Sequence, residues 1–325
     1  MFVFGKPKAP AYDPAEGHPL VRKGLAALEA RDWPNLAALY EGQEPSDRFH
    51  FVRGLGELSK LDDDIPVTFD DPRMLTIGAG VRVGWAWRHR GGGGGETVTE
   101  DGGRNMMRCL GEAEEMLHVV GEKAPEDSTA IAFHIRTEMG LGGDYANLVP
   151  LLARAARSKE ANIFVATSHL MFVTPKWHGS IEQMWSVANG YASKPHNAAW
   201  VAVAALGHME EYLYCAAFSE DRDQREAYQA KLRDPEFRNF AGEMDALFWK
   251  TAEEKPMTGS EAVFSHNAFG AFLVLLNAVD LSRRHLERMG PCFTRIPWYY
   301  AEYHENPLLW LNGIRKRASL PPLRA

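Results

Sequence analysis

The sequence APEDSTAIAFHIRTEMGLGGDYANLVPLLARAARSK, residues 124–159, has the pattern of two α-helices joined by a short turn. Pro125 and its acidic neighbours precede the first run of helically spaced apolar residues, and a Gly-Gly pair at 142–143 separates that run from the second. Comparable pairs of runs begin near Glu160 and near Pro195, so the unit recurs every 35 residues. Tetratricopeptide-type units have about 34 residues and bury their apolar faces only by stacking on their neighbours. We therefore expect an all-α fold in which tetratricopeptide-like helical hairpins form a superhelical solenoid.

Helical periodicity continues on both sides of this central region, whereas stretches that favour β-strands are few and short. In FLVLLNAVD, residues 272–280, apolar residues cover all faces, as in a helix enclosed between layers, and we expect this segment to end a helix that begins at Gly259.

A chain of 325 residues exceeds the usual size of one hydrophobic core. We expect an N-terminal helical region that ends in a glycine-rich loop, residues 1–97, then the helical repeats, residues 98–220, and a C-terminal helical region packed on the array, residues 221–325.

The composition excludes several classes of partner. The chain has 36 basic and 43 acidic residues and a net charge of −7. Nucleic-acid binding requires clustered Lys and Arg that neutralise phosphates, so we expect no nucleic-acid partner. No run of about 18 apolar residues occurs, so we expect no membrane-spanning segment. The three cysteines lie far apart, and the first residues lack the apolar stretch of a secretory signal, which predicts a cytoplasmic protein without a disulfide framework.

Five consecutive glycines occur in RHRGGGGGETVTEDG, residues 88–102. A phosphate-binding loop needs a lysine and a hydroxyl residue after its last glycine, but Glu96 follows Gly95 here. The dinucleotide-binding pattern also fails, because its sixth position is Glu96 or Thr97 instead of glycine. Repeated glycine keeps the backbone free. The pattern therefore predicts a mobile hinge or lid, followed by a helix that Thr99 caps.

Aromatic and charged residues near the turns are candidates for contacts with a partner. Trp85 and Arg88 lie three residues apart on one helix face, where a ring and a guanidinium can grip an anionic or aromatic group. A core tryptophan beside a solvated arginine explains the same pair more simply. In KWHGSIEQM, residues 176–184, each residue has a structural explanation, with Gly179 in a turn and Ser180 as a helix cap. The candidate partner-binding residues are Trp85, Arg88, Arg90, Lys176, Trp177, His208 and Glu211.

Two His/Glu pairs have helical spacing. Glu115 and His118 stand three residues apart in the order that di-iron helical bundles use, and His208 and Glu211 repeat the spacing in reverse. A di-metal site needs a complete set of inward-facing ligands, which two half-motifs do not supply. We therefore predict no metal and no cofactor. The less favoured alternative is that these four residues bind a metal.

No catalytic constellation is recognisable in the sequence. It contains no G-x-S-x-G motif, and no cysteine has a catalytic signature around it. Cys109 and Cys215 lie among apolar helical neighbours, where thiols behave as small inert hydrophobes. The acidic run at residues 62–64 is interpreted as an exposed turn, because no second ligand motif accompanies it.

Several short motifs occur in a fixed order: SDRFHFVRGLGEL, the DDP before a helix that ends in GWAWRHRGG, ETVTEDG, AEEML with APED after it, and KWHGSIEQM. Over residues 20–214 the chain thereby resembles an uncharacterised bacterial family, a domain of unknown function that is similar to tetratricopeptide arrays. The resemblance implies an all-helical superhelix and a cytoplasmic location. It implies no established activity and no catalytic residues. The glycine run is unusually long for that family.

The repeat spacing and the lack of a catalytic set favour a non-catalytic scaffold that binds a peptide or protein partner on its concave face. The alternative is a metal- or cofactor-dependent modifying enzyme with a site between helical layers and residues 91–95 as its lid. A third hypothesis is a structural subunit in which Trp298 and Trp310 bury a homo-oligomeric surface. We rank the scaffold first and the enzyme last.

Overall fold

The computed structural model describes residues 13–63, 65–66, 69–177, 179–301 and 307–323. These residues form helices and no β-strand, as the helical periodicity predicts. Within them, no helix combines the length and the apolar composition that crossing a bilayer requires. The chain divides into two compact units, and the three regions expected from the sequence stay a prediction. The N-terminal unit is His18–Tyr191 with Thr258–Glu261, and the C-terminal unit comprises the described parts of Met1–Gly17, Ala192–Met257 and Ala262–Ala325.

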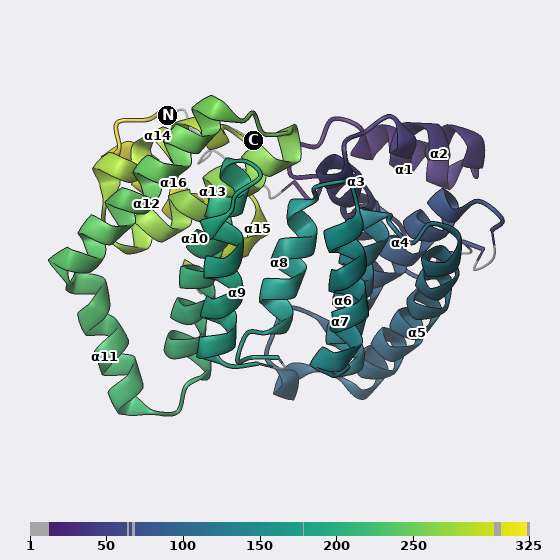
Figure 1. Ribbon diagram of the computed structural model, residues 1–325, viewed down its shortest axis with the longest axis horizontal. Helices are drawn as coiled ribbons and strands as arrows, with labels where there is room; N and C mark the ends of the chain where they lie inside the picture. The colour runs from purple at the N-terminus through teal and green to yellow at the C-terminus, as the bar shows by residue number, and fades with distance from the viewer. Residues whose placement is uncertain (1–12, 64, 67–68, 178, 302–306, 324–325) are drawn as a thin grey trace, which may run out of the picture. The chain divides into compact units, whose positions relative to one another are not determined.

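The N-terminal unit, drawn mainly in purple to teal in Figure 1, is built from α1 to α9 and one short 3₁₀ helix, η1. Its elements are α1 (Val21–Glu29), α2 (Trp33–Glu41), α3 (Pro45–Leu58), α4 (Pro72–Arg90), η1 (Gly95–Thr97), α5 (Glu100–Lys123), α6 (Ser128–Leu141), α7 (Tyr145–Arg157), α8 (Ile163–Phe172) and α9 (Ile181–Ser193).

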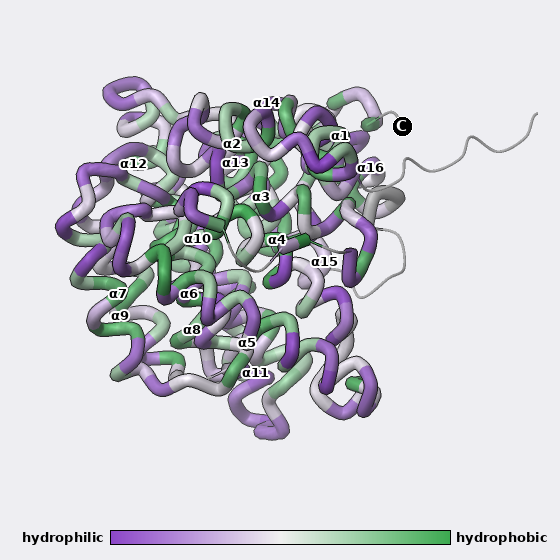
Figure 2. Tube along the Cα trace, turned by 90° about the vertical axis from the view of Figure 1, so that its right-hand side faces the viewer, coloured by the Kyte–Doolittle hydropathy of each residue, from purple (hydrophilic) through white to green (hydrophobic). Residues whose placement is uncertain are grey.

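The C-terminal unit, green to yellow in Figure 1, contains the remaining elements. These are α10 (Ala198–Leu213), the π-helical turn η2 (Tyr214–Phe218), α11 (Arg222–Arg233), α12 (Pro235–Glu254), α13 (Gly259–Leu275), α14 (Val279–Met289), α15 (Arg295–Ala301) and α16 (Pro307–Arg317). Along the tube of Figure 2, hydrophobic and hydrophilic residues alternate within many of the helices. This alternation is typical of amphipathic helices that bury one face.

The core of the N-terminal unit gathers around α3 and α6. The long helices α4 and α5 share the most extensive contact, and α6 packs against α4, α5, α7 and α8. Helix α3 also contacts α6 and α8, although these helices are distant from it in sequence. The Phe49 ring of α3 stacks on Phe133 of α6 and on Phe164 of α8, with centroid distances of 4.4 and 4.5 Å. These stacked rings add specific geometry to the burial of apolar surface.

The predicted period of the repeat is confirmed by the starts of α6, α8 and α10, which lie 35 residues apart. The residue before each start is Asp127, Asn162 or Asn197. Each of these side chains accepts a hydrogen bond from the backbone N–H two residues later, over 2.9, 2.9 and 3.0 Å respectively. Such caps satisfy amide groups that the first helical turn leaves without a partner. The same capping chemistry therefore recurs with the period.

Helices α3 and α4 cross in backbone contact at two glycines. A Cβ at Gly56 would lie 3.0 Å from the Cα of Gly84, and a Cβ at Gly84 would lie 2.8 Å from the Cα of Gly56. Both distances are shorter than carbon–carbon contact at optimal separation, which is about 3.5–4.0 Å. Any larger residue at either position would push the two helices apart.

The C-terminal unit buries the segment that the sequence predicts to be enclosed, but it divides the predicted helix. Phe272 and Leu273 are fully buried in α13. The expected helix from Gly259 to Asp280 is wrong in its end, because α13 stops at Leu275 and α14 begins at Val279, after a three-residue turn. Asn277 in that turn has a φ of 52°, a left-handed conformation that Asn tolerates better than most residues.

Trp298 and Trp310 also belong to the C-terminal unit. Trp298 is fully buried, and its Nε1–H donates to Oδ1 of Asn267 over 2.7 Å. The two indole rings meet edge to face, with centroids 5.9 Å apart. Trp298 therefore packs within its own unit and presents no exposed surface, while the hypothesis of a homo-oligomer stays a prediction.

Candidate functional site

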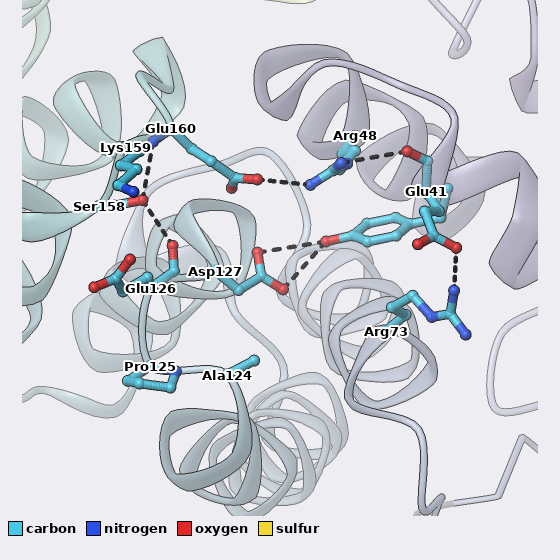
Figure 3. A pocket seen from close by; sticks show the side chains of 11 residues that line it. Glu41, Arg48, Arg73, Ala124, Pro125, Glu126, Asp127, Ser158, Lys159 and Glu160 are labelled. Atoms are coloured by element: carbon cyan, nitrogen blue, oxygen red, sulfur yellow. Dashed lines mark hydrogen bonds and ion pairs between the residues drawn. The ribbon is translucent and has the colours of Figure 1, made fainter.

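A pocket of about 520 Å³ lies in the N-terminal unit, lined by two interhelical loops and by residues of α2, α3 and α4 (Figure 3). Its volume falls in the range of about 300–1,000 Å³ that ligand sites occupy. Most of its lining residues carry a carboxylate, a guanidinium, an ammonium or a hydroxyl group. The lining residues are Tyr40, Glu41, Arg48, Arg73, Ala124, Pro125, Glu126, Asp127, Ser158, Lys159 and Glu160.

Asp127 is the hydrogen-bonded centre of the pocket floor. As the cap of α6, it accepts from the backbone N–H groups of Thr129 and Ala130 over 2.9 and 3.1 Å. The hydroxyl of Thr76 on α4 lies 2.9 Å from its Oδ2, and the Tyr40 hydroxyl on α2 donates to the same oxygen over 3.3 Å. One carboxylate thus joins the start of α6 to two other helices.

Burial controls the protonation of this centre. It raises the pKa of the Asp127 carboxyl above the ordinary 3.8, and the hydrogen bonds from Ala130 and Thr76 offset the rise only in part. Burial, together with the negative charge of Asp127, also raises the pKa of Tyr40 well above 10.0. Tyr40 therefore remains a protonated hydrogen-bond donor at neutral pH.

A half-buried ion pair forms one side of the pocket. Arg48 Nη1 lies 3.0 Å from Oε1 of Glu160, and the guanidinium of Arg48 sits over the Tyr40 ring at 5.4 Å from its centroid. Ser128 Oγ donates to the other carboxylate oxygen of Glu160 over 3.2 Å. Both charges are therefore already compensated inside the protein, and they shape the wall more than they attract a ligand.

Ser158 holds the two loops together. Its Oγ donates to the backbone carbonyl of Glu126 over 2.8 Å and accepts from the backbone N–H of Glu160 over 3.1 Å. Nucleophilic catalysis would require an adjacent base such as histidine, and no histidine or cysteine stands among the lining residues described. Ser158 therefore joins the two loops through its hydrogen bonds.

The rim carries charges of both signs. Arg73 forms ion pairs with Asp71 and with Glu41, and its hydrogen bond to Asp71 lowers the pKa of that carboxyl. Lys159 and Glu126 are exposed, and within the described part of the chain neither side chain has an ion-pair partner. The pocket therefore offers one ammonium group and one carboxylate to a ligand.

Trp85 and Arg88, two of the predicted partner-binding residues, fasten α4 to the end of α3. Trp85 is 2% exposed, and its Nε1–H donates to Oγ of Ser59 over 2.9 Å. Arg88 Nη1 donates to the carbonyl oxygens of Gly56 and Ser59 over 3.0 and 2.7 Å. These bonds satisfy carbonyl groups at a helix C-terminus.

Arg90 and Trp177 are brought together, although they are far apart in sequence. The Arg90 guanidinium lies 5.4 Å from the centroid of the Trp177 ring, which meets the edge of Trp87 at the same centroid distance. Arg90 also donates to the carbonyl oxygen of Gly93 over 2.9 Å. Lys176, the neighbour of Trp177, is half-buried. This cluster does not line the pocket.

The first predicted His/Glu pair faces solvent. Glu115 and His118 are both exposed on α5, and the ring of His118 meets the edge of His134 at 5.1 Å. Within the described residues, neither belongs to a group of three or more metal-ligating side chains.

The second pair lies in the C-terminal unit and is largely buried. The His208 ring stacks on Phe272 at 4.5 Å, and burial lowers the pKa of His208 to about 4. Glu211 forms an ion pair with Lys231 over 2.8 Å. Neither His208 nor Glu211 belongs to a group of three metal ligands among the described residues.

The glycine run begins where α4 ends. Gly91 has a φ of 80°, which glycine adopts without steric cost. The predicted cap of the following helix is confirmed, because Thr99 Oγ1 accepts from the backbone N–H of Gly102 over 3.1 Å. The role of the run as a hinge or lid stays a prediction.

Reasoning from the sequence missed the pocket. The stretch before α6 showed a proline with acidic neighbours, but gave no sign that Tyr40 approaches Asp127 from 87 residues earlier. A short acidic loop at the start of a repeat was the available signal. The contact itself depends on how α2 packs, which periodicity does not specify.

Comparisons with models of known protein families, with curated proteins and with solved structures give no match. The resemblance to an uncharacterised tetratricopeptide-like family stays a prediction.

Proposed function

We propose that this chain is a non-catalytic, tetratricopeptide-like scaffold that binds a peptide segment of a protein partner in the pocket around Asp127. One observation carries the proposal. Lys159 and Glu126 stand exposed, without described ion-pair partners, beside a floor whose polar groups are hydrogen-bonded to each other. Such a surface is ready to pair with charges on a ligand without first breaking internal contacts.

The packing of the helices supports the solenoid part of the proposal. Contacts of α4 with α6 and of α6 with α8 join next-but-one helices, as expected when helical hairpins stack. The pocket wall is formed partly by the loops before α6 and α8, which occupy corresponding places in the repeat. Loops of this kind are common places for binding residues on a rigid helical support.

The charges of the wall favour a peptide over a small phosphorylated ligand. A phosphate site needs several convergent donors that are free to neutralise it. Arg48 is paired with Glu160, and Arg73 is paired with Asp71 and Glu41. A peptide that carries an acidic and a basic side chain would pair with Lys159 and Glu126 and leave those internal pairs intact.

The proposal is tested by selecting peptides from a displayed random library on the purified full chain and measuring their affinities by calorimetry. We expect selected peptides to carry charges of both signs, and Lys159→Glu or Glu126→Lys to weaken binding at least about tenfold, or about 1.4 kcal/mol. The doubly substituted chain, Lys159→Glu with Glu126→Lys, should select peptides with the two charges exchanged in order.

The matched control is an exposed pair in the C-terminal unit, Arg222 and Glu226, which form an i,i+4 ion pair on α11. Exchanging these two charges should leave the affinity of the selected peptides unchanged. Selected peptides that bind the Lys159 and Glu126 variants as tightly as the unmodified chain would overturn the proposal.

A further inference from the structure

Three metal-ligating side chains converge near the end of α4, in the N-terminal unit. Asp62 lies in the turn after α3, His89 lies in the last turn of α4, and Cys109 lies on α5. One ligand atom from each lies within 4.8 Å of the other two. Within the described residues this is the one such trio of His, Cys, Asp or Glu side chains. It shares no residue with the pocket around Asp127.

The separations suit a tetrahedral ion. His89 Nε2 lies 3.0 Å from Oδ2 of Asp62, and Cys109 Sγ lies 3.8 Å from Oδ1 of Asp62. Zn–N and Zn–O bonds of about 2.0–2.2 Å and Zn–S bonds of about 2.3 Å place neighbouring ligands of a tetrahedral site about 3.3–3.6 Å apart. Both distances are close to that range, but His89 faces Oδ2 of Asp62 whereas Cys109 faces Oδ1. Side-chain movements that bring one oxygen of Asp62 to both partners would complete one face of a tetrahedron.

The two ligands from α4 and α5 are sheltered from water. Cys109 is fully buried, and Nε2 of His89 is also inaccessible. Although this nitrogen is close to Asp62, the contact is poorly aligned for a hydrogen bond. A buried polar atom without a well-formed bond is unfavourable, and a bound cation would satisfy it.

The surroundings of Asp62 leave one of its oxygens available. Arg108 donates to Oδ1, while Oδ2 is the oxygen that faces His89. Arg108 also pairs with Glu112, which in turn accepts from Arg82. Hydrogen bonds of this kind to the second oxygen of a ligating carboxylate fix its orientation in metal sites.

We infer that Asp62, His89 and Cys109 form a Zn²⁺ site, with the fourth position of the tetrahedron left to water. The donor set selects the metal, because thiolate and imidazole suit Zn²⁺ whereas Ca²⁺ and Mg²⁺ prefer oxygen ligands throughout. Three protein ligands with one open position are the arrangement of zinc sites that also bind water or a substrate. The inference stands apart from peptide binding, because neither site needs the other.

The test titrates the metal-free full chain with Co²⁺, whose tetrahedral complexes with thiolate have a charge-transfer absorption that an all-oxygen or all-nitrogen site lacks. We expect saturation at one Co²⁺ per chain and loss of the absorption on addition of Zn²⁺. Cys109→Ser should abolish the charge-transfer band. Asp62→Asn and His89→Gln should each weaken binding by at least about tenfold, the lower end of the losses seen even for outer partners of metal ligands.

The other two cysteines supply matched controls, so Cys215→Ser and Cys292→Ser should leave the band and its stoichiometry unchanged. Circular dichroism confirms that each variant is folded, and the Asp62 and His89 variants decide the question if Cys109→Ser does not fold. The inference is overturned if the chain gives no charge-transfer band, if the band depends on Cys215 or Cys292, or if the Asp62 and His89 variants bind Co²⁺ as tightly as the unmodified chain.

Discussion

Asp127 in the N-terminal unit and Asp245 in the C-terminal unit both anchor a polar network, but Asp127 lines the pocket described above and Asp245 does not. Asp245 Oδ1 lies 2.7 Å from Nε2 of His285 and accepts from Trp249 Nε1 over 3.0 Å. The second ring nitrogen of His285 lies 3.1 Å from Nδ1 of His266. Each carboxylate therefore collects donors from helices that are separate in the chain.

The two networks differ in their exposure to solvent. His285 is fully buried, and its ring stacks on Phe269 at 4.9 Å and tilts against Phe248 at 5.0 Å. Aromatic side chains thus close the network around Asp245, and its hydrogen bonds hold the core together. The network around Asp127 stops at an open wall with exposed charges, so the same acceptor chemistry also shapes a surface. The position of a carboxylate relative to solvent, more than its hydrogen bonds, distinguishes a structural centre from a candidate site.

Lowering the pH should give the largest difference between the two networks, because it changes their contributions to the free energy of unfolding in opposite directions. Burial lowers the pKa of His266 to about 3 and also lowers the pKa of His285, whereas an unfolded histidine titrates near 6.5. The unfolded chain then binds more protons, so the free energy of unfolding falls as the pH falls below 6.5, by up to about 1.4 kcal/mol per pH unit for each such histidine. Four further histidines add to the effect, each with a pKa lowered to about 4: His18, His134, His169 and His208.

Asp127 should act in the opposite direction. Its pKa is raised, so the folded chain holds that proton more tightly, and this group alone would add stability as the pH falls toward 3.8. Urea unfolding at pH 7 and pH 5 measures the balance, and we expect a large net loss of stability at pH 5. His285→Gln should reduce the pH dependence, while His118→Gln at an exposed position should not. Equal stability at the two pH values would contradict the assignment of the histidines.

Removing Asp245 should be the most damaging single change in this comparison. Asp245→Ala leaves His285 and Trp249 without their shared acceptor in a closed core. Buried groups deprived of a partner cost about 1–3 kcal/mol each, so we expect a loss of about 3 kcal/mol in the free energy of unfolding. Urea denaturation measures it, with Asp280→Ala as the control, because Asp280 forms an exposed pair with Arg238 that is worth about 1 kcal/mol or less. A loss as small as that of the control would refute a structural role for the closed network.

Removing Asp127 should have a smaller effect, since water can enter the pocket. Asp127→Ala loses the cap of α6 and the acceptor for Tyr40 and Thr76, and we expect a loss of about 2 kcal/mol. Asp127→Asn keeps an oxygen acceptor, as Asn162 does at the start of α8, and should lose less than about 1 kcal/mol. The same urea experiment distinguishes these outcomes. If the alanine and asparagine variants were equally destabilised, the negative charge and not the cap would hold the pocket floor.

The sequence predicts the elements of this fold better than the contacts between them. The 35-residue period and the cap at Thr99 follow from local patterns, because apolar spacing and capping act within one helix. The end of α13 at Leu275 does not follow, since an apolar run hides the left-handed turn at Asn277. The pocket and the Asp62–His89–Cys109 trio depend on residues that packing brings together across the chain. His89 was embedded in the glycine-rich motif, and nothing local linked it to Cys109.

The crossing of α3 and α4 limits which substitutions leave the spacing of Asp62, His89 and Cys109 unchanged. The backbones of Gly56 and Gly84 are in contact, so no side chain lies between the two helices at this point that could adjust to a substitution. Asp62 lies six residues after Gly56, and His89 lies five residues after Gly84. A larger residue at either glycine would therefore move α3 away from α4 and increase the distance between Asp62 and His89. A single methyl group outside the trio would thus alter the spacing of its side chains.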